Sequence, residues 1–326
     1  MKLPRFPHRV AVALVLLAFT AHAGAENYPD KPLRMIVPYS PGGPNDILGR
    51  LVSHQLTLRW KQTVVVENRG GIGGTIGMAA LTKLPGDGYT LGMGGSSNLA
   101  VAPHVRAQLA YDPRKDITPI ISVAVVPYAL AVNPSVPAKD MKELIRIARA
   151  KAGFLSYGSS GVGSMSHLAA ELLKSLSKTN IAHIPYKGTV PALTDVVTGQ
   201  IDMMLADLAI IRPHADAGKL RVLGVTGPRR SVTSPAVPTI AESGLPGYDI
   251  SPWFGVVAPP GVPKDRVERL NAAIDGSLKS AEVIQRLDAL GYEPLGGSAD
   301  QFAATIKTDI VKYAGIVKSA GIKAGL

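Results

Sequence analysis

Hydroxyl side chains and glycines gather in short loops along this chain. The hydroxyl groups could act as nucleophiles, and both the hydroxyl groups and the main-chain N–H groups of the glycines could donate hydrogen bonds to an anion. The richest loop, residues 158–167, reads Gly-Ser-Ser-Gly-Val-Gly-Ser-Met-Ser-His. A nucleophile elbow needs Gly-x-Ser-x-Gly, but around Ser160 the last position is Val162. Ser164 and His167 lie three residues apart at a predicted helix start, with no third group in place to orient the histidine. We therefore expect a capped helix or a ligand donor here rather than a catalytic pair.

A second loop, residues 38–46, reads Pro-Tyr-Ser-Pro-Gly-Gly-Pro-Asn-Asp and joins a predicted strand to a predicted helix. Gly42 and Gly43 permit backbone conformations closed to other residues and let a ligand approach the main chain. The free N–H groups at a helix N-terminus favour an anion. The alternative is an ordinary strand-to-helix turn capped by Asn45 or Asp46, and this loop alone favours neither.

Two further patterns resemble nucleotide-binding signatures but are incomplete. Gly71 and Gly73 fit a dinucleotide fingerprint, but Ile76 stands where its third glycine belongs, and the Lys187-Gly-Thr segment lacks the upstream glycine of a Walker motif. The seven histidines show no metal-ligand spacing, and the absence of cysteine removes disulfides, thiol nucleophiles and thiolate metal sites. We expect no cofactor, no metal and no enzymatic activity, only binding.

The first 25 residues are predicted to be a signal peptide for export. Lys2, Arg5 and Arg9 precede an apolar stretch, residues 10–20, that is too short to span a bilayer. Cleavage is expected after Ala23 or Ala25, and we favour the second. Removal takes three basic residues and no acidic one, so the net charge falls from +11 to +8. The basic residues are scattered without a nucleic-acid motif, which favours capture of anionic solutes by a soluble, exported protein.

Strands and helices that alternate along the chain must position these loops. Predicted strands cover residues 33–37, 63–67, 89–93, 117–126, 128–132, 154–157, 181–184, 201–205, 220–225 and 251–257. Predicted helices include residues 47–56, 191–198, 238–243, 264–279, 281–290 and 299–319, with others ending at residue 83, following residue 98, opened by Asn133 and following Ser164. Such alternation indicates α/β layers with largely parallel sheets.

Several of these strands share one feature, because at least four end in loops of Gly, Ser, Thr, Asn and Pro that each lead into a helix. Open α/β sheets bind ligands outside the carboxyl ends of their strands. Roughly 300 residues after export are enough for two domains, and we expect the chain to cross between them near Pro127 and return around residues 248–253. Two facing domains would bring several helix N-termini and hydroxyls to one cleft, which suits a small carboxylate.

Six short motifs follow one another along the chain. They are Val37-Pro38-Tyr39 with Pro41-Gly42-Gly43, Val66-Glu67-Asn68-Arg69, Asp87-Gly88-Tyr89-Thr90-Leu91, Tyr157-Gly158-Ser159-Ser160-Gly161, Pro185-Tyr186-Lys187-Gly188 and Trp253-Phe254-Gly255. In this order and spacing the chain resembles, from Tyr28 to its C-terminus, the TctC-like substrate-binding proteins of tripartite tricarboxylate transporters, the Bug family of periplasmic solute receptors.

The resemblance implies a two-lobed Venus flytrap fold of type II, with a mostly parallel sheet in each lobe. Lobe 1 would comprise residues 26–127 and 250–326, and lobe 2 residues 128–249. It also implies a monomer in the periplasm that closes on a small organic carboxylate and delivers it to the membrane subunits of a transporter, with no cofactor and no nucleic acid partner.

The resemblance also implies a set of ligand-binding residues. The matching positions are Tyr39, Ser40, Gly42, Gly43, Ser96, Ser97, Ser159, Ser160, Gly163, Ser164, Tyr186 and Lys187. The chain departs from the family pattern twice, with Asn45 in place of a frequent threonine and with Asp207 one position later than the usual acid. We expect Asp207 to reach the site as well and to disfavour a second carboxylate on the ligand.

Three alternatives stay open. The ligand could be an aromatic carboxylate, with Tyr39, Tyr186 and Trp253 beside its ring. The protein could instead be an exported hydrolase that uses Ser164 or Ser160 with His167. A receptor that signals to a sensor kinase would share the same fold.

Overall fold

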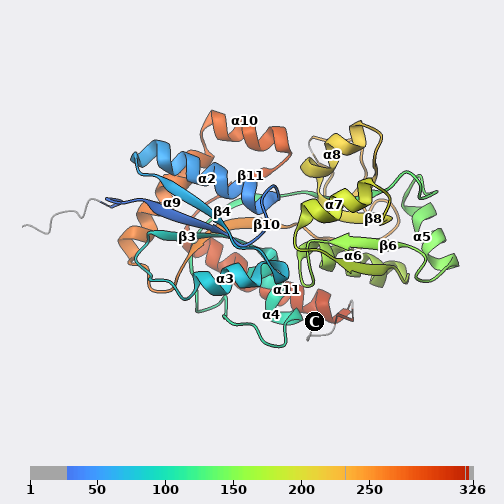
Figure 1. The fold of residues 1–326 in the computed structure, drawn as a ribbon, viewed down its shortest axis with the longest axis horizontal. Coiled ribbons are helices and arrows are strands. Elements are labelled where there is room, and N and C mark those ends of the chain that lie inside the picture. Colours follow the sequence, from blue (N-terminus) through green and yellow to red (C-terminus); the bar gives the residue numbers. More distant parts are fainter. Residues whose placement is uncertain (1–27, 232, 320, 323–326) are drawn as a thin grey trace, which may run out of the picture.

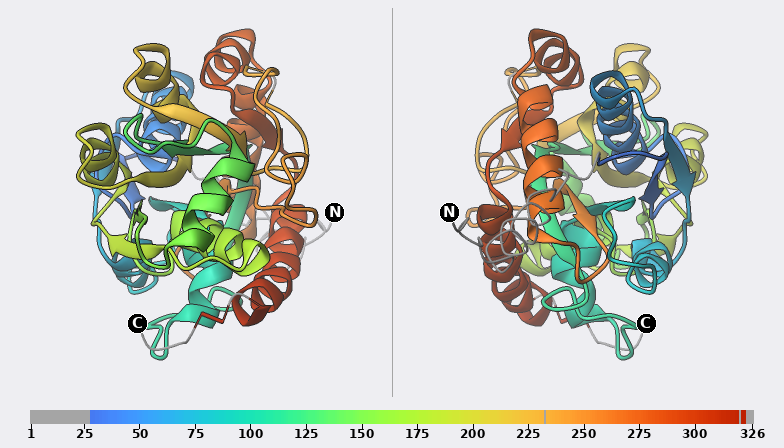
Figure 2. Two further views of the ribbon diagram at one scale, coloured as in Figure 1. Left: turned by 90° about the vertical axis from the view of Figure 1, so that its right-hand side faces the viewer. Right: turned by 90° about the vertical axis from the view of Figure 1, so that its left-hand side faces the viewer.

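The chain forms two β-sheets that lie next to each other along the long axis of the molecule, each with helices on its faces (Figure 1). The computed structural model describes residues 28–231, 233–319 and 321–322, so the predicted signal peptide lies outside the described residues. We call the part built on the six-stranded sheet lobe 1 and the part built on the five-stranded sheet lobe 2. Views along the long axis show lobe 2 facing the viewer in the left panel and lobe 1 facing the viewer in the right panel (Figure 2).

Lobe 1 has the strand order β11-β4-β10-β3-β1-β2. Its strands are β1 (Leu33–Val37), β2 (Val64–Asn68), β3 (Thr90–Gly95), β4 (Thr118–Val125), β10 (Trp253–Ala258) and β11 (Glu293–Gly296). Its helices are α2 (Pro44–Trp60), η1 (Ile72–Gly74), α3 (Thr75–Leu81), the π-helix η2 (Ser97–Val101), α4 (Ala102–Val105), α9 (Lys264–Leu278), α10 (Ala281–Leu290) and α11 (Ala299–Ser319).

Lobe 2 has the strand order β7-β6-β8-β5-β9. Its strands are β5 (Tyr128–Val132), β6 (Ser156–Ser159), β7 (Ala182–Pro185), β8 (Met203–Asp207) and β9 (Arg221–Val225). Its helices are α5 (Met141–Ala150), α6 (Met165–Ser177), α7 (Thr189–Val197) and α8 (Leu208–Asp216). No helix among the described residues is long and apolar enough to cross a membrane.

Both sheets are mixed, so the prediction of mostly parallel sheets is wrong in this detail although the α/β class is confirmed. Strand β1 pairs in parallel with β2 and β3, whereas β10 is antiparallel to β3 and β4. In lobe 2, β6 is parallel to β7 and β8, but β5 is antiparallel to β8 and β9. Strands β5 and β10 run against their neighbours because each enters its sheet from the other lobe, without a crossover helix from a strand of the same sheet. Strand β11, which follows α10 within lobe 1, is also antiparallel to its neighbour β4.

The chain passes from β4 to β5 through residues 126–127 and returns from β9 to β10 through residues 226–252. The lobe bounds at residues 26–127, 128–249 and 250–326 stay a prediction. Helix α11 packs on β4 and η2 of lobe 1 and also contacts α6 of lobe 2. Its Tyr313 is fully buried, so the C-terminal helix belongs to the packed core of the molecule.

Most predicted elements lie within a few residues of the observed ones, and the errors have local causes. Asn133 opens a turn, in which its side-chain oxygen accepts the Ser135 N–H at 2.9 Å, and helix α5 begins only at Met141 behind the cap Asp140. Residues 238–243 form turns and a single bridge rather than a short helix. The prediction missed α8 and β11.

Candidate ligand-binding site

Two helix N-termini from different lobes face each other across the cleft. Helix α2 begins behind Gly43 and helix α7 behind Gly188, and neither has a side chain that caps it. A methyl group added at Gly43 would lie 3.8 Å from the Thr189 hydroxyl oxygen, and one at Gly188 would lie 3.3 Å from the Cβ of Ser40. The first turn of a helix has N–H groups without intrahelical partners. The positive ends of two helix dipoles therefore lie next to the same space between the lobes.

A narrow cavity lies between these helix ends. It is lined by Tyr39, Ser40, Gly43, Pro44, Asn45, Ser97, Tyr128, Ser160, Thr189 and Phe254. Water-sized molecules have access to about 20 Å³ of it, which is room for about one water. Every lining residue is uncharged, so the cavity offers hydroxyl groups, an amide and main-chain dipoles rather than ionised side chains.

Hydrogen bonds cross the cleft directly on either side of this cavity. The Ser40 hydroxyl donates to the Lys187 carbonyl oxygen at 3.1 Å, and the Met165 N–H donates to the Ser97 hydroxyl at 2.9 Å. The Arg106 guanidinium donates to the carbonyl oxygen of Val162. The two lobes are therefore in contact around the cavity, and an organic acid needs them to separate before it can enter.

Five of the predicted site residues line the cavity: Tyr39, Ser40, Gly43, Ser97 and Ser160. The Tyr39 hydroxyl donates to the Gly73 carbonyl oxygen at 2.7 Å, and burial raises the pKa of Tyr39 to about 12. Its phenol is therefore neutral at ordinary pH and adds no negative charge to the site.

Three predicted residues of the lobe 2 loop shape the loop instead of lining the cavity. The fully buried Ser159 hydroxyl bonds to His183 Nε2 at 2.7 Å and accepts the Gly161 N–H at 3.2 Å. The Gly163 N–H donates to His167 Nδ1 at 3.1 Å. Ser164 caps α6, because its hydroxyl accepts the backbone N–H of His167 at 3.3 Å.

Four other predicted residues also lie outside the cavity lining. The Tyr186 hydroxyl donates to Asp195 Oδ2 at 2.5 Å. Lys187 is exposed and contributes its carbonyl oxygen to the contact with Ser40. Ser96 is buried. The Gly42 N–H donates to Asp46 Oδ2 at 3.0 Å, an arrangement supported by a positive φ of 91°.

Asp207 joins the two lobes and does not line the cavity. Its carboxyl group caps α8 by accepting the Ala209 N–H at 2.9 Å, and it also accepts the Tyr292 hydroxyl from lobe 1. Burial raises the pKa of Asp207 to about 7, and these two hydrogen bonds oppose the rise. The acid that the sequence assigns to the ligand is thus part of a contact between the lobes.

Five lining residues were missed: Pro44, Asn45, Tyr128, Thr189 and Phe254. Asn45 was assigned to a helix cap, but its side-chain N–H donates to the Met93 carbonyl oxygen at 3.0 Å. Thr189 follows Gly188, the N-cap of α7, and glycine is one of the residues accepted at a helix N-cap. Tyr128 and Phe254 belong to strands, where an aromatic residue gives no sign that it borders a ligand rather than the core.

The Ser164–His167 pair has the contacts of a helix cap. The serine hydroxyl is bonded to the backbone of His167, while the imidazole accepts the Gly163 N–H. A general base needs its ring nitrogen within hydrogen-bond reach of the nucleophile. Among the described residues, no group of three or more His, Cys, Asp or Glu is placed to hold a metal ion.

Comparisons with known proteins identify the family. Residues 48–322 match the tripartite tricarboxylate transporter family receptor. Protein BugT of Bordetella pertussis is 34% identical over 324 residues, covering 99% of both chains. The structure of R. palustris Rpa4515 with adipate is 36% identical with a TM-score of 0.89, covering 91% of this chain and 100% of the other. MatC (Rpa3494) from Rhodopseudomonas palustris with bound malate is 30% identical with a TM-score of 0.85, covering 89% and 100%.

These similarities confirm the two-lobed Venus flytrap fold that the sequence motifs predicted. The match to BugT extends over nearly the whole chain and so includes the loops that meet at the cavity, whereas the family match begins at residue 48, after the loop of residues 38–46. The chain belongs to the tripartite tricarboxylate transporter receptor family, the Bug family of periplasmic solute-binding proteins.

Proposed function

We propose that this receptor captures a small carboxylate between its lobes and delivers it to the membrane subunits of a tripartite tricarboxylate-type transporter. The observation that carries the proposal is the pair of uncapped N-termini of α2 and α7, which face one cavity from opposite lobes. An anion at a helix N-terminus gains about 0.3–1 kcal/mol from the dipole. Each hydrogen bond to a charged group adds about 1.5–3 kcal/mol. Adipate and malate, which two relatives hold, are both carboxylates.

The neutral lining favours a monocarboxylate, or a diacid whose second group points away from the helix ends. Two carboxylates in one space repel each other unless cations or donors separate them. The lining residues are uncharged, so nothing among them would neutralise three carboxylates in the manner that citrate needs. Asp207, bonded to Tyr292 and Ala209, does not supply the repulsion that the sequence suggested.

An aromatic carboxylate is a second candidate, because three aromatic residues border the cavity. These are Tyr39, Tyr128 and Phe254. Only Tyr39 belongs to the expected set, since Tyr186 bonds to Asp195 and the indole of Trp253 donates to Asp309 while its ring packs edge-on against Phe302. A ligand ring packed against one of the three lining aromatic residues would contribute about 0.5–1.5 kcal/mol to the binding free energy beyond the effect of its buried area.

The rest of the proposal follows from this role. The chain is exported to the periplasm, loses residues 1–25 on export, acts as a monomer and catalyses no reaction, and a receptor that signals to a sensor kinase would share the same fold. The lobes meet at residues 127–128 and 249–250. The ligand-contacting residues are those that line the cavity, with Ser159, Gly163 and Ser164 in supporting positions.

The test is a comparison of carboxylic acids with their matching amides. Replacing a carboxylate by an amide keeps the shape, removes the charge and introduces an N–H₂ group that competes with the donors of the site. Thermal unfolding with adipate, malate, benzoate and citrate, each beside its amide, should show stabilisation by one or more acids and none by the amides. A ligand at 100 times its Kd adds about 2.7 kcal/mol. Equal stabilisation by an acid and its amide would exclude the carboxylate site.

A further inference from the structure

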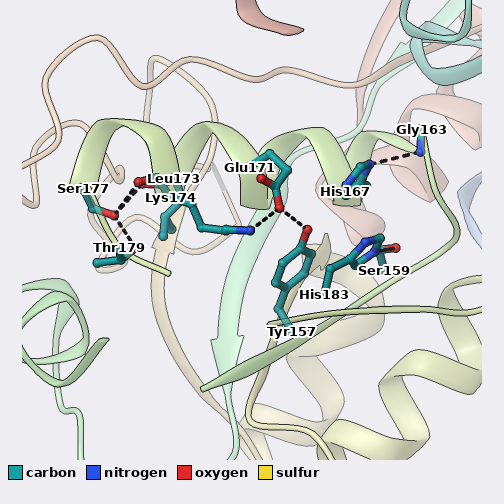
Figure 3. A network of polar contacts seen from close by, with 10 residues as sticks. All are labelled: Tyr157, Ser159, Gly163, His167, Glu171, Leu173, Lys174, Ser177, Thr179 and His183. Carbon is teal, nitrogen blue, oxygen red and sulfur yellow. Dashed lines mark hydrogen bonds and ion pairs between the residues drawn. The ribbon is translucent and has the colours of Figure 1, made fainter. Parts of the chain in front are cut away.

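Three aromatic rings, those of Tyr157, His183 and His167, are stacked in lobe 2 beside the chain between Ser159 and Gly163 (Figure 3). The rings of Tyr157 and His183 have centroids 4.7 Å apart at an interplanar angle of 12°, and those of His183 and His167 are 4.2 Å apart at 13°. Such an arrangement comes from three different elements, β6, β7 and α6. The stack therefore joins a helix to two neighbouring strands.

Each histidine bonds to a different end of the loop formed by residues 159–163. His183 Nε2 lies 2.7 Å from the hydroxyl oxygen of Ser159, and that oxygen also accepts the Gly161 N–H. His167 Nδ1 accepts the Gly163 N–H at 3.1 Å. The two imidazoles thus fix the main chain on both sides of the segment that holds Ser160.

This segment carries the contacts that matter for the cavity. Ser160 lines the cavity, and the carbonyl oxygen of Val162 accepts the guanidinium of Arg106 from lobe 1. Gly163, at a φ of 78°, lies so close to lobe 1 that an added methyl group would be 2.6 Å from the side chain of Val105. A change in the loop backbone would move the cavity wall and the contact between lobes together.

The surroundings keep both imidazoles neutral. His167 Nδ1 accepts an N–H, so it cannot carry a proton in this geometry. Burial lowers the pKa of His167 to about 4, with Lys174 and Arg106 adding to the effect. Burial also lowers the pKa of His183 to about 4, with His167 and Lys174 acting in the same direction and Glu171 against them.

Two charged residues beside the stack, Glu171 and Lys174, form an ion pair with each other. Glu171 Oε1 accepts the Tyr157 hydroxyl and the Lys174 ammonium, each at 2.6 Å. The Lys174 nitrogen also lies 5.6 Å from the centroid of the Tyr157 ring. The Glu171 carboxylate thus bonds to Tyr157 and Lys174, and among the described residues it bonds to neither histidine. A protonated imidazole would therefore not be hydrogen-bonded to this carboxylate.

We propose that His183 and His167 are positioning residues for ligand binding, which hold residues 159–163 in the conformation where Ser160 faces the cavity and Val162 meets lobe 1. The inference rests on the proposed function, since it takes the cavity at Ser160 to be the ligand site. It assigns the histidines a role outside the cavity, because they act through the loop and not on the ligand.

Matched substitutions separate this role from packing alone. His167→Asn places an amide oxygen near the position of Nδ1, and His183→Gln places polar atoms near Nε2, whereas His167→Leu and His183→Leu remove the hydrogen bond. We expect the leucine variants to bind adipate, or whichever acid of the panel binds, at least about tenfold more weakly. The asparagine and glutamine variants should stay within about threefold of the wild type.

Amide hydrogen exchange measured by NMR reads the loop without any ligand. In the leucine variants the Gly161 and Gly163 amides should exchange at least about tenfold faster, while amides of β1 in lobe 1 keep their wild-type rates. Unchanged exchange and affinity in both leucine variants would overturn the inference. If the wild type binds no acid of the panel, the proposed function fails, and the exchange rates still decide whether the histidines hold the loop.

Nitrogen chemical shifts of the imidazoles provide a readout that survives if a leucine variant does not fold. The wild-type His167 should be the neutral tautomer with its proton on Nε2, and it should gain a second proton only near pH 4. The Gly163 amide resonance should shift in the same pH range, and this shift should be absent in His167→Asn. Protonation of His167 near its unperturbed pKa of about 6.5, with no response of Gly163, would refute the role.

Discussion

At the scale of single residues, the two glycines before α2 have different roles in the site. Gly42 has a positive φ of 91°, and a methyl group there would lie 3.2 Å from Val190 of lobe 2. Gly43 has an ordinary extended conformation, with φ of −88° and ψ of 174°, and a methyl group there would make an ordinary van der Waals contact with the Thr189 hydroxyl oxygen at 3.8 Å. The first glycine is required by the backbone, whereas the second leaves room at the helix end.

We therefore predict that Gly43→Val abolishes carboxylate binding and leaves the fold largely intact. The branched side chain would fill the space between the N-termini of α2 and α7, where an anion would sit, without forcing a positive φ. Gly43→Ala is the matched control and should weaken binding much less. Calorimetric titration beside a thermal unfolding curve measures both effects, and normal affinity of the valine variant would show that this loop is a simple turn.

The polar part of the cavity could be predicted from residue types, whereas its apolar wall could not. Ser40 and Ser160 lie in loops and Ser97 begins η2, and all three stand in stretches rich in turn formers, where a hydroxyl is conspicuous in the sequence. Tyr128 and Phe254 stand in apolar strands, and only the meeting of two lobes turns them toward a cavity. Ser159 was predicted to lie in the loop but is the last residue of β6, and whether its hydroxyl points outward or toward His183 depends on packing that the sequence does not display.

At the scale of elements, strands with apolar β-branched runs and helices with clear periodicity were predictable. Strand β1 and helix α11 have the predicted bounds. Helix α8 was missed because it is short, contains Pro213 and begins directly behind a strand, where Asp207 looks like a loop residue. The four-residue strand β11, with a proline and a glycine, also lacks the usual strand pattern.

The contact between α8 and lobe 1 should make stability depend on pH through Asp207. Its pKa is raised to about 7 in the folded protein by burial, against about 3.9 in an unfolded chain. Between these values the folded state holds a proton that the unfolded state releases, so this group lowers stability as pH rises from about 4 to 7. Asp207→Asn removes that titration and keeps an oxygen that can accept the Tyr292 hydroxyl.

The free energy of unfolding in urea, measured from about pH 4.5 to about pH 9.5 for both proteins, checks this prediction. The variant should gain stability relative to the wild type as the pH rises, and the difference should level off above about pH 8. A difference that stays constant over the whole range would mean that Asp207 is ionised throughout, as an exposed carboxylate would be.

At the scale of the whole molecule, the cavity and its surroundings predict that the lobes must separate and close again. The cavity admits about one water, so it is too small for an organic acid to enter while Ser40, Ser97 and Arg106 bond to lobe 2. The chain passes between the sheets at residues 126–127 and 226–252, which can act as a hinge.

Small-angle X-ray scattering should therefore give a smaller radius of gyration with saturating acid than without it. The matching amide, which should not bind, is the control for solvent effects. If calorimetry proves that the acid binds and the scattering profile does not change, the ligand enters without closure, and the direct contacts across the cleft would then be permanent parts of a rigid molecule.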